Sequence, residues 1–217
     1  MHRPSLLPAA IVVLLSLPGA AFATDVLQDA RVQIAMTDPV SCDVTVSIGV
    51  ALDLGRDIEQ RLQRLEGSRV DLLGISGGSQ VAPPRTIGLT EMLAIRFANA
   101  GSHRYEVRYR VTHPEAWAYR CPVWLPAIAA DGRSRNVSIE VTLPPAARPA
   151  GGAFPAFEWQ NGAGRAILGH LPAFVRVPYA VPGHPPPTAH NVGRIMDLAA
   201  IGILLVGTAF WATRRRR

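Results

Sequence analysis

The stretch Cys42-Asp43-Val44-Thr45-Val46-Ser47-Ile48-Gly49-Val50-Ala51-Leu52 changes character at every step. Apolar residues occupy its even-numbered positions, and polar or small residues occupy the odd ones. Side chains of a β-strand point alternately to the two faces of a sheet, so this period of two predicts a strand with one buried face. The stretch therefore indicates a β-rich fold.

Alternating runs also occur further along the chain. Leu93 to Phe97 and Tyr105 to Val111 both alternate, and Asn99-Ala100-Gly101-Ser102 is typical of a turn, so the region predicts a hairpin with one charged face. Four other segments predict short strands, the last two at sheet edges because they contain Pro155, Pro172 and Pro178: Arg69–Ile75, Val137–Leu143, Phe154–Trp159 and Arg165–Tyr179. Repeated short strands predict a mainly β fold, an immunoglobulin-like β-sandwich.

One segment favours a helix instead of a strand. Asp57 can cap a helix, Gln60 three residues later can complete a capping box, and Gly67 can end it. Its apolar residues at helical spacing are Ile58, Leu62 and Leu65. We therefore expect one short helix inserted among the strands, with its apolar side packed on the core.

The N-terminus has the parts of a secretory signal peptide. A basic start at Met1-His2-Arg3 precedes an apolar run from Leu6 to Leu17, and Ala21-Phe22-Ala23 supplies the small residues of a cleavage site. An uncleaved anchor helix is the alternative, but Pro18 and Gly19 interrupt the run at a length too short to span a membrane. Residues 1–23 are therefore expected to be a cleaved leader.

The C-terminus predicts a membrane anchor. The 19 residues from Ile195 to Thr213 are almost entirely apolar. A helix of this length spans about 28 Å, close to the ~30 Å hydrocarbon core of a bilayer. We expect a transmembrane helix over residues 194–213 that contacts the bilayer. The cytoplasmic tail is expected to be Arg214, Arg215, Arg216 and Arg217, which set the orientation by the positive-inside rule.

The composition of the chain between the leader and the anchor indicates its cellular location and its net charge. The chain has no Lys, and its many Arg, Ala, Gly and Pro residues are typical of a GC-rich bacterial genome, so we expect the inner membrane, with residues 24–180 in the periplasm. Residues 181–193 form a Pro-rich spacer. Between residues 24 and 193 there are 16 Arg against 15 Asp plus Glu, which leaves a net charge of +1. A basic footprint for nucleic acid is therefore absent from the exported part of the sequence.

Cys42 and Cys121 are the two cysteines of the chain. An even number of cysteines in an oxidising compartment predicts a disulfide bond. A redox-active or metal-binding pair is the alternative, but the two residues lack the close Cys-x-x-Cys spacing typical of redox thiols. We therefore expect a structural disulfide.

No sequence motif indicates a particular reaction or cofactor. Gly-x-Ser-x-Gly, His-Glu-x-x-His, P-loop and dinucleotide fingerprints do not occur in the sequence, so no cofactor is expected. Two alternatives stay open. The first is a periplasmic copper- or zinc-binding accessory protein, with ligands His103, His113 and Cys121. The second is a hydrolase that assembles distant residues such as Ser76, Ser79 and His170.

The segment from Trp117 to Pro126 concentrates aromatic residues and prolines. Exposed Trp and Tyr side chains are common anchors of protein interfaces, so Trp117, Tyr119 and Trp124 are a possible interaction surface. The alternative is a covering loop that fills one end of the sandwich. We expect the chain to be a non-enzymatic interaction or assembly module with a membrane or periplasmic protein partner.

The run Tyr105 to Val111, the aromatic segment and the run Val137 to Pro144 together resemble the extracytoplasmic β-domain of bacterial predicted membrane proteins of unknown function. The resemblance implies an exported sandwich near a membrane helix and brings no catalytic residues. The C-terminal tail resembles the tripartite sorting signals of Gram-negative bacteria, although no clear recognition motif precedes Ile195.

Overall fold

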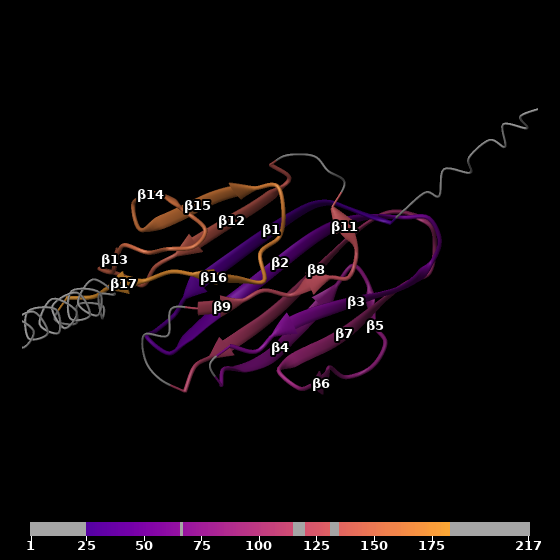
Figure 1. The fold of residues 1–217 in the computed structure, drawn as a ribbon, viewed down its shortest axis with the longest axis horizontal. Helices are drawn as coiled ribbons and strands as arrows, with labels where there is room; N and C mark the ends of the chain where they lie inside the picture. The colour runs from indigo at the N-terminus through magenta and orange to yellow at the C-terminus, as the bar shows by residue number, and fades with distance from the viewer. Residues whose placement is uncertain (1–24, 66, 115–119, 131–134, 183–217) are drawn as a thin grey trace, which may run out of the picture.

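In the part of the chain that the computed structural model describes, every regular element is a β-strand (Figure 1). The structure describes residues 25–65, 67–114, 120–130 and 135–182. Within these residues no helix is long and apolar enough to cross a membrane. The expected leader, transmembrane helix and arginine tail lie outside the described residues, as does all of the expected spacer beyond residue 182.

The largest element is an eight-stranded sheet that is antiparallel except around β1, which pairs in parallel with β12 and β11. In spatial order its strands are β14 (Glu158–Gln160), β15 (Ala163–Leu168), β12 (Val137–Thr142), β1 (Val26–Met36), β2 (Ser41–Leu52), β8 (Gly101–Thr112) and β4 (Arg69–Ser76), with the short β11 (Ala129–Ala130) beside β1. The stretch 42–52 is thus confirmed as a strand, near the centre of this sheet.

A second sheet has five strands, and two strand pairs complete the fold. The second sheet contains β10 (Leu125–Pro126), β3 (Arg56–Gln63), β7 (Thr90–Phe97), β5 (Ser79–Gln80) and β6 (Arg85–Ile87), the last two both pairing with β7. The small pairs are β9 (Arg120–Pro122) with β16 (Phe174–Arg176), and β13 (Arg148–Pro149) with β17 (Tyr179–Ala180).

The buried faces of the eight-stranded and five-stranded sheets form one hydrophobic core. Val46 and Val107 of the eight-stranded sheet belong to the same cluster as Ile95 of the five-stranded sheet. Between the sheets, Gln60 Nε2 donates a hydrogen bond of 2.6 Å to Tyr105 Oη. The two sheets therefore pack face to face.

The strands β7 and β8 are confirmed, but their predicted hairpin pairing is wrong. β7 pairs with β3, β5 and β6, whereas β8 pairs with β2 and β4 in the other sheet. The turn after Phe97 carries the chain across the core, so the apolar faces of both strands meet each other: the rings of Phe97 and Tyr105 are 5.4 Å apart. Alternation specifies that each strand has a buried face, but does not specify its neighbour.

The predicted helix is also wrong, because residues 56–63 form β3. Ile58, Gln60 and Leu62 all point into the core and are at most 1% exposed. The polar Gln60 in the middle of this inward row conceals the period of two, while Ile58 and Leu62 also satisfy helical i, i+4 spacing. Pairing with β7 satisfies the backbone of this segment as a strand.

Candidate functional site

The expected aromatic interaction surface loses one of its three members to the core. Trp124 is 0% exposed, and its ring lies edge-on to Tyr109 at a centroid distance of 6.4 Å. Tyr109 Oη in turn donates a hydrogen bond of 2.9 Å to the carbonyl of Pro122. Trp117 and Tyr119 lie outside the described residues. Trp124 therefore serves packing, as the covering-loop alternative implies.

The two cysteines lie close together in the core. Cys42 of β2 and Cys121 of β9 are both buried, and their Sγ atoms are 3.3 Å apart, although the structure holds them as unbonded thiols. Burial, together with the neighbouring Cys42 sulfur, raises the pKa of the Cys121 thiol well above its usual value. Sequence-distant cysteines thus meet as expected, and the disulfide itself stays a prediction.

The three proposed metal ligands do not converge on one point: His113 lines a small cavity with Cys42, the neighbour of Cys121, but His103 is remote from both. His103 lies near the start of β8 and His113 just past its end, so a strand rise of ~3.3 Å per residue puts them about 33 Å apart. His103 Nε2 instead contacts the carbonyl of Asn99 at 2.8 Å. Among the described residues no group of three His, Cys, Asp or Glu side chains is arranged to hold a metal. The cluster His103, His113 and Cys121 is therefore not formed.

The suggested hydrolase residues do not meet either. Ser76 ends β4, and His170 follows β15. These strands are five positions apart in the same sheet, which at ~4.8 Å per strand is about 24 Å. Ser79 lies on β5 in the other sheet. Ser76 and His170 thus do not form a nucleophile–base pair.

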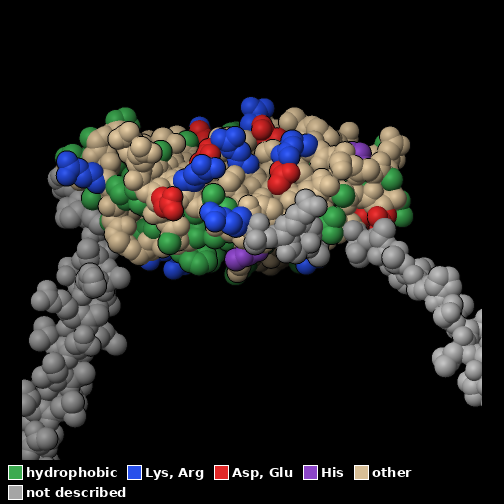
Figure 2. Space-filling view, turned by 90° about the horizontal axis from the view of Figure 1, so that it is seen from above, with side chains coloured by type: hydrophobic (Ala, Val, Ile, Leu, Met, Phe, Trp, Pro, Cys, Tyr) green, Lys and Arg blue, Asp and Glu red, His purple; other side chains and the backbone are tan. Residues whose placement is uncertain are grey.

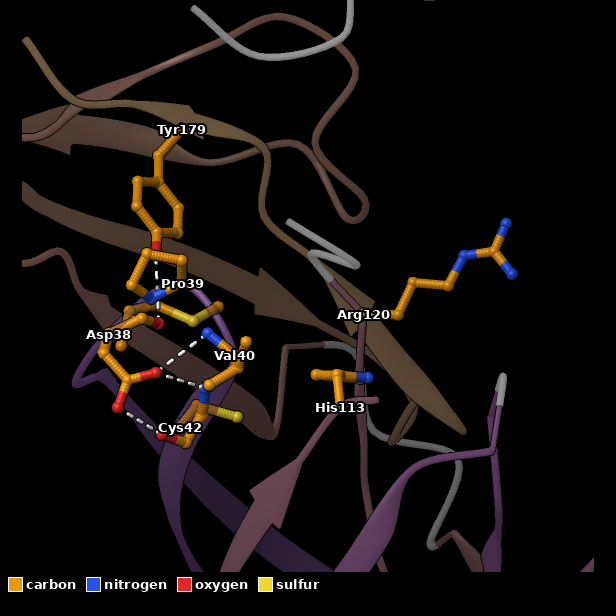
Figure 3. A pocket seen from close by; sticks show the side chains of 9 residues that line it. Asp38, Pro39, Val40, Cys42, His113, Arg120 and Tyr179 are labelled. Carbon is orange, nitrogen blue, oxygen red and sulfur yellow. Dashed lines mark hydrogen bonds between the residues drawn. The ribbon is translucent and has the colours of Figure 1, made fainter. Parts of the chain in front are cut away.

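A small cavity beside Cys42 is built around Asp38 (Figure 3). Asp38 Oδ1 accepts hydrogen bonds of 2.8 Å from the backbone N–H groups of Val40 and Ser41, and Tyr179 Oη donates to the Asp38 carbonyl at 3.1 Å. The cavity volume of about 20 Å³ has room for roughly one water molecule. The arrangement shapes the β1–β2 turn and is too small for an organic ligand.

Because of the Asp38 carboxylate in the β1–β2 turn, we expect the protein to lose stability in acid. The hydrogen bond from the Ser41 hydroxyl, followed by the two backbone N–H donors, lowers the pKa of Asp38 below its usual 3.8. A carboxyl group with a depressed folded-state pKa stabilises the fold above its unfolded pKa, and that stabilisation is lost as the pH falls through the folded value. We therefore expect the melting temperature to fall below about pH 4.

Asp38→Ala should cost about 1–2 kcal/mol at neutral pH, because it removes the acceptor of these hydrogen bonds. It should also make the acid loss shallower than in the wild type. Thermal melting followed by circular dichroism from pH 7 to pH 2 tests both effects. Equal acid slopes for the two proteins would contradict the role of Asp38.

A groove runs over the outer face of the five-stranded sheet. Met92 and Ala94 of β7 form its floor, and the segment Val81–Pro83 forms one wall. Asp57, Glu59 and Arg85 also line this groove of about 320 Å³. The groove combines an apolar floor with a charged rim.

The two carboxylates at the rim of the groove have ion-pair partners, whereas the arginine at the rim has none among the described residues. Asp57 is ion-paired with Arg96 at 2.8 Å, and the hydrogen bond from Arg96 lowers the pKa of Asp57. Glu59 is ion-paired with Arg61 at 2.8 Å. In the part of the chain that the structure describes, Arg85 has neither an ion pair nor a side-chain hydrogen bond.

Two large aliphatic side chains are exposed beside the groove. The β6–β7 turn has Gly88 at a φ of 60°, and Ile87 and Leu89 on either side of it are 65% and 70% exposed. We call these two residues the apolar tip. The tip and Arg85 are not among the residues expected from the sequence, although aliphatic residues on both sides of a turn glycine are a signal that the sequence carries.

A second hollow, of about 610 Å³, is lined by polar and apolar residues alike. It lies over β12, β15 and β14 and is lined by Glu140, Glu158 and Arg165 among others. Glu140 is already held by Arg31 at 2.8 Å and by Gln33 at 3.3 Å. On the face shown in Figure 2, arginine and carboxylate side chains lie next to one another rather than in separate patches.

Comparison with known proteins gives no family for the chain. No protein family model matches it, and no curated protein matches it. Among solved structures it is similar to an M1 zinc metallopeptidase from Deinococcus radiodurans, with 16% identity and a TM-score of 0.41 over 67% of this chain and 39% of that chain. It is also similar to native yeast LTA4 hydrolase, with 8% identity and a TM-score of 0.46 over 75% and 32%. The chain thus spans well under half of these enzymes, and similarity at this level carries no argument about its function.

Proposed function

We propose that this chain is a non-enzymatic interaction or assembly module that binds a membrane or periplasmic protein. The proposal includes export, a C-terminal membrane anchor and a cytoplasmic arginine tail, as the ends of the sequence predict. The metal-binding and hydrolase alternatives receive no support from the geometry, because His103 lies about 33 Å from His113 and Ser76 lies about 24 Å from His170.

The apolar tip is the observation that carries the proposal. Turns between strands usually expose Gly, Asn, Asp, Ser or Pro, but here the turn exposes Ile87 and Leu89. Exposed aliphatic groups that cluster together are typical of protein interaction sites, whereas scattered single ones need no explanation. Two such groups beside an apolar groove therefore favour a docking surface.

The packing of the two sheets also supports an interaction module, although less specifically than the apolar tip does. Two sheets packed face to face are the architecture of sandwich domains, and we propose an immunoglobulin-like sandwich as the class. The parallel pairing of β1 with β12 differs from the antiparallel sheets typical of that class. Sandwiches of this kind often serve recognition, but the site decides the function.

Site-specific crosslinking tests the proposal. A photoreactive amino acid at position 89 of the full chain, irradiated in native membranes, should give one dominant crosslinked protein, identified by mass spectrometry. Leu54 is the matched control, because it is an exposed leucine, at 61%, in the turn between β2 and β3. Position 54 should crosslink at least fivefold less of that protein.

Substitution should give the same answer independently. The double variant Ile87→Ser, Leu89→Ser should lose the partner from chemical crosslinks in native membranes, while Leu54→Ser should retain it. Surface changes of this kind usually alter stability by no more than about 0.5 kcal/mol, so both variants should fold. Equal crosslinking at positions 54 and 89, or retention of the partner by the double serine variant, would refute the proposal.

A further inference from the structure

We propose that the groove of the five-stranded sheet binds an extended segment of the partner protein that combines aliphatic side chains with a carboxylate. This inference rests on the proposed function and adds the site and the chemistry of the bound segment. The groove and the apolar tip form one continuous surface, because Arg85 pairs with Met92 and Ile87 pairs with Thr90 in register along the same two strands.

The groove is built to be rigid before anything binds. Its wall is tied down where the Val81 backbone N–H donates to the Ala94 carbonyl at 3.0 Å. Within the wall, Gln80 Nε2 donates to the Ala82 carbonyl at 2.9 Å, and Pro83 and Pro84 follow. A preformed wall reduces the ordering that binding must otherwise impose, and its prolines prevent this edge from simply adding another strand.

The dimensions suit a segment of polypeptide. A volume of about 320 Å³ lies at the lower end of ligand pockets, which are ~300–1,000 Å³. Met92 and Ala94 give an apolar floor, and Ile87 continues that apolar surface beyond Arg85. An aliphatic side chain on the floor and another four residues further along, against Ile87, would place the residue midway between them, whose side chain points to the same side of an extended segment, beside Arg85.

Charge indicates what that middle residue is. The two carboxylates at the opposite rim, Asp57 and Glu59, are already neutralised by Arg96 and Arg61. Arg85 is the charged rim residue without a partner among those described. A guanidinium group preferentially binds carboxylates through paired N–H donors, so the bound segment supplies Asp, Glu or a chain terminus.

A random heptapeptide library displayed on phage and selected on the full chain in detergent tests this. The selected peptides should combine at least one aliphatic residue with Asp or Glu. Synthetic copies should bind at least tenfold more weakly to Arg85→Glu and to Ala94→Trp, which fills the floor. Replacing the acidic residue of a peptide by Lys should restore binding to Arg85→Glu. Arg148→Glu, an exposed arginine of β13, is the control and should bind like the wild type.

Three results would overturn the inference. The first is no enrichment over the bare support, and the second is binding that Arg85→Glu leaves unchanged. The third is a dimer in sedimentation velocity that Arg85→Glu abolishes, because a second copy would then occupy the groove. If position 89 still crosslinks its partner in any of these cases, the proposed function stands and only the inference about the groove fails.

Discussion

Oxidation of Cys42 and Cys121 to a disulfide is expected to raise the free energy of unfolding by about 4.5 kcal/mol. The two residues are 79 positions apart, and a cross-link that closes a loop of this length removes about that much chain entropy from the unfolded state. Their Sγ atoms are already 3.3 Å apart in the folded chain, so the bond needs little rearrangement. For a domain of this size, such a contribution is a large share of the total stability.

The measurement compares urea unfolding of the oxidised protein with that of the Cys42→Ala, Cys121→Ala double variant and of the fully reduced protein. Free thiols are counted with a thiol reagent in denaturant. The oxidised protein should show none. Both comparison proteins should unfold at clearly lower urea concentrations. Two titratable thiols in protein purified without reductant would show that the pair stays reduced.

The fully reduced protein has to be prepared in denaturant. Both cysteines are buried, so a reductant reaches the disulfide poorly in the folded protein. Burial also raises the pKa of the Cys121 thiol, which makes it a poor leaving group. Reductant should therefore act slowly under native conditions and quickly in urea. Equal rates of reduction in the two conditions would mean that the pair is not sequestered.

Trp124→Ala is expected to destabilise the domain by about 3–5 kcal/mol. The indole is fully buried, packs edge-on against Tyr109 and lies two residues past the end of β9. Its removal leaves a cavity at a junction between the two sheets, because the neighbouring β10 pairs with β3. Thermal and urea unfolding measure the effect.

Leu89→Ala is the control for this experiment. Leu89 is 70% exposed, so its truncation should change stability by no more than about 0.5 kcal/mol. Trp124→Phe should fall between the two. If Trp124→Ala kept wild-type stability but lost the crosslinked partner, Trp124 would act at an interface and not in the core.

Strand existence could be predicted from the sequence, because burial of one face leaves a period of two in the residues themselves. The runs around Val46, Val107 and Ile139 all showed it, and all are strands. Gln60 defeated the same reasoning, because a polar residue can occupy an inward position once Tyr105 on the other sheet supplies a hydrogen-bond partner. That partner is a property of the tertiary structure and has no local signal.

The candidate site was harder to predict for a related reason. Trp124 and Tyr119 are equally aromatic in sequence, and nothing local indicates that Trp124 is enclosed. Arg85 stands out only because its neighbours' charges are satisfied elsewhere, and those pairings join residues of different strands, such as Asp57 with Arg96. The proximity of the two cysteines was the exception. An even number of cysteines predicts that they pair, and this prediction needs no information about the structure.

The parallel pairing of β1 with β12 sets the order in which the chain can fold. Asn136 Nδ2 donates to the Gln28 carbonyl, 108 residues earlier, and Ala30 pairs with Val137. During synthesis or translocation, β1 can pair with β2 at once, but its other edge stays open until β12 has emerged. Contacts this distant slow folding, and an open strand edge invites pairing with other chains. Nascent chains that stall before residue 137 should therefore depend on a holding chaperone, whereas chains released after β15 should not.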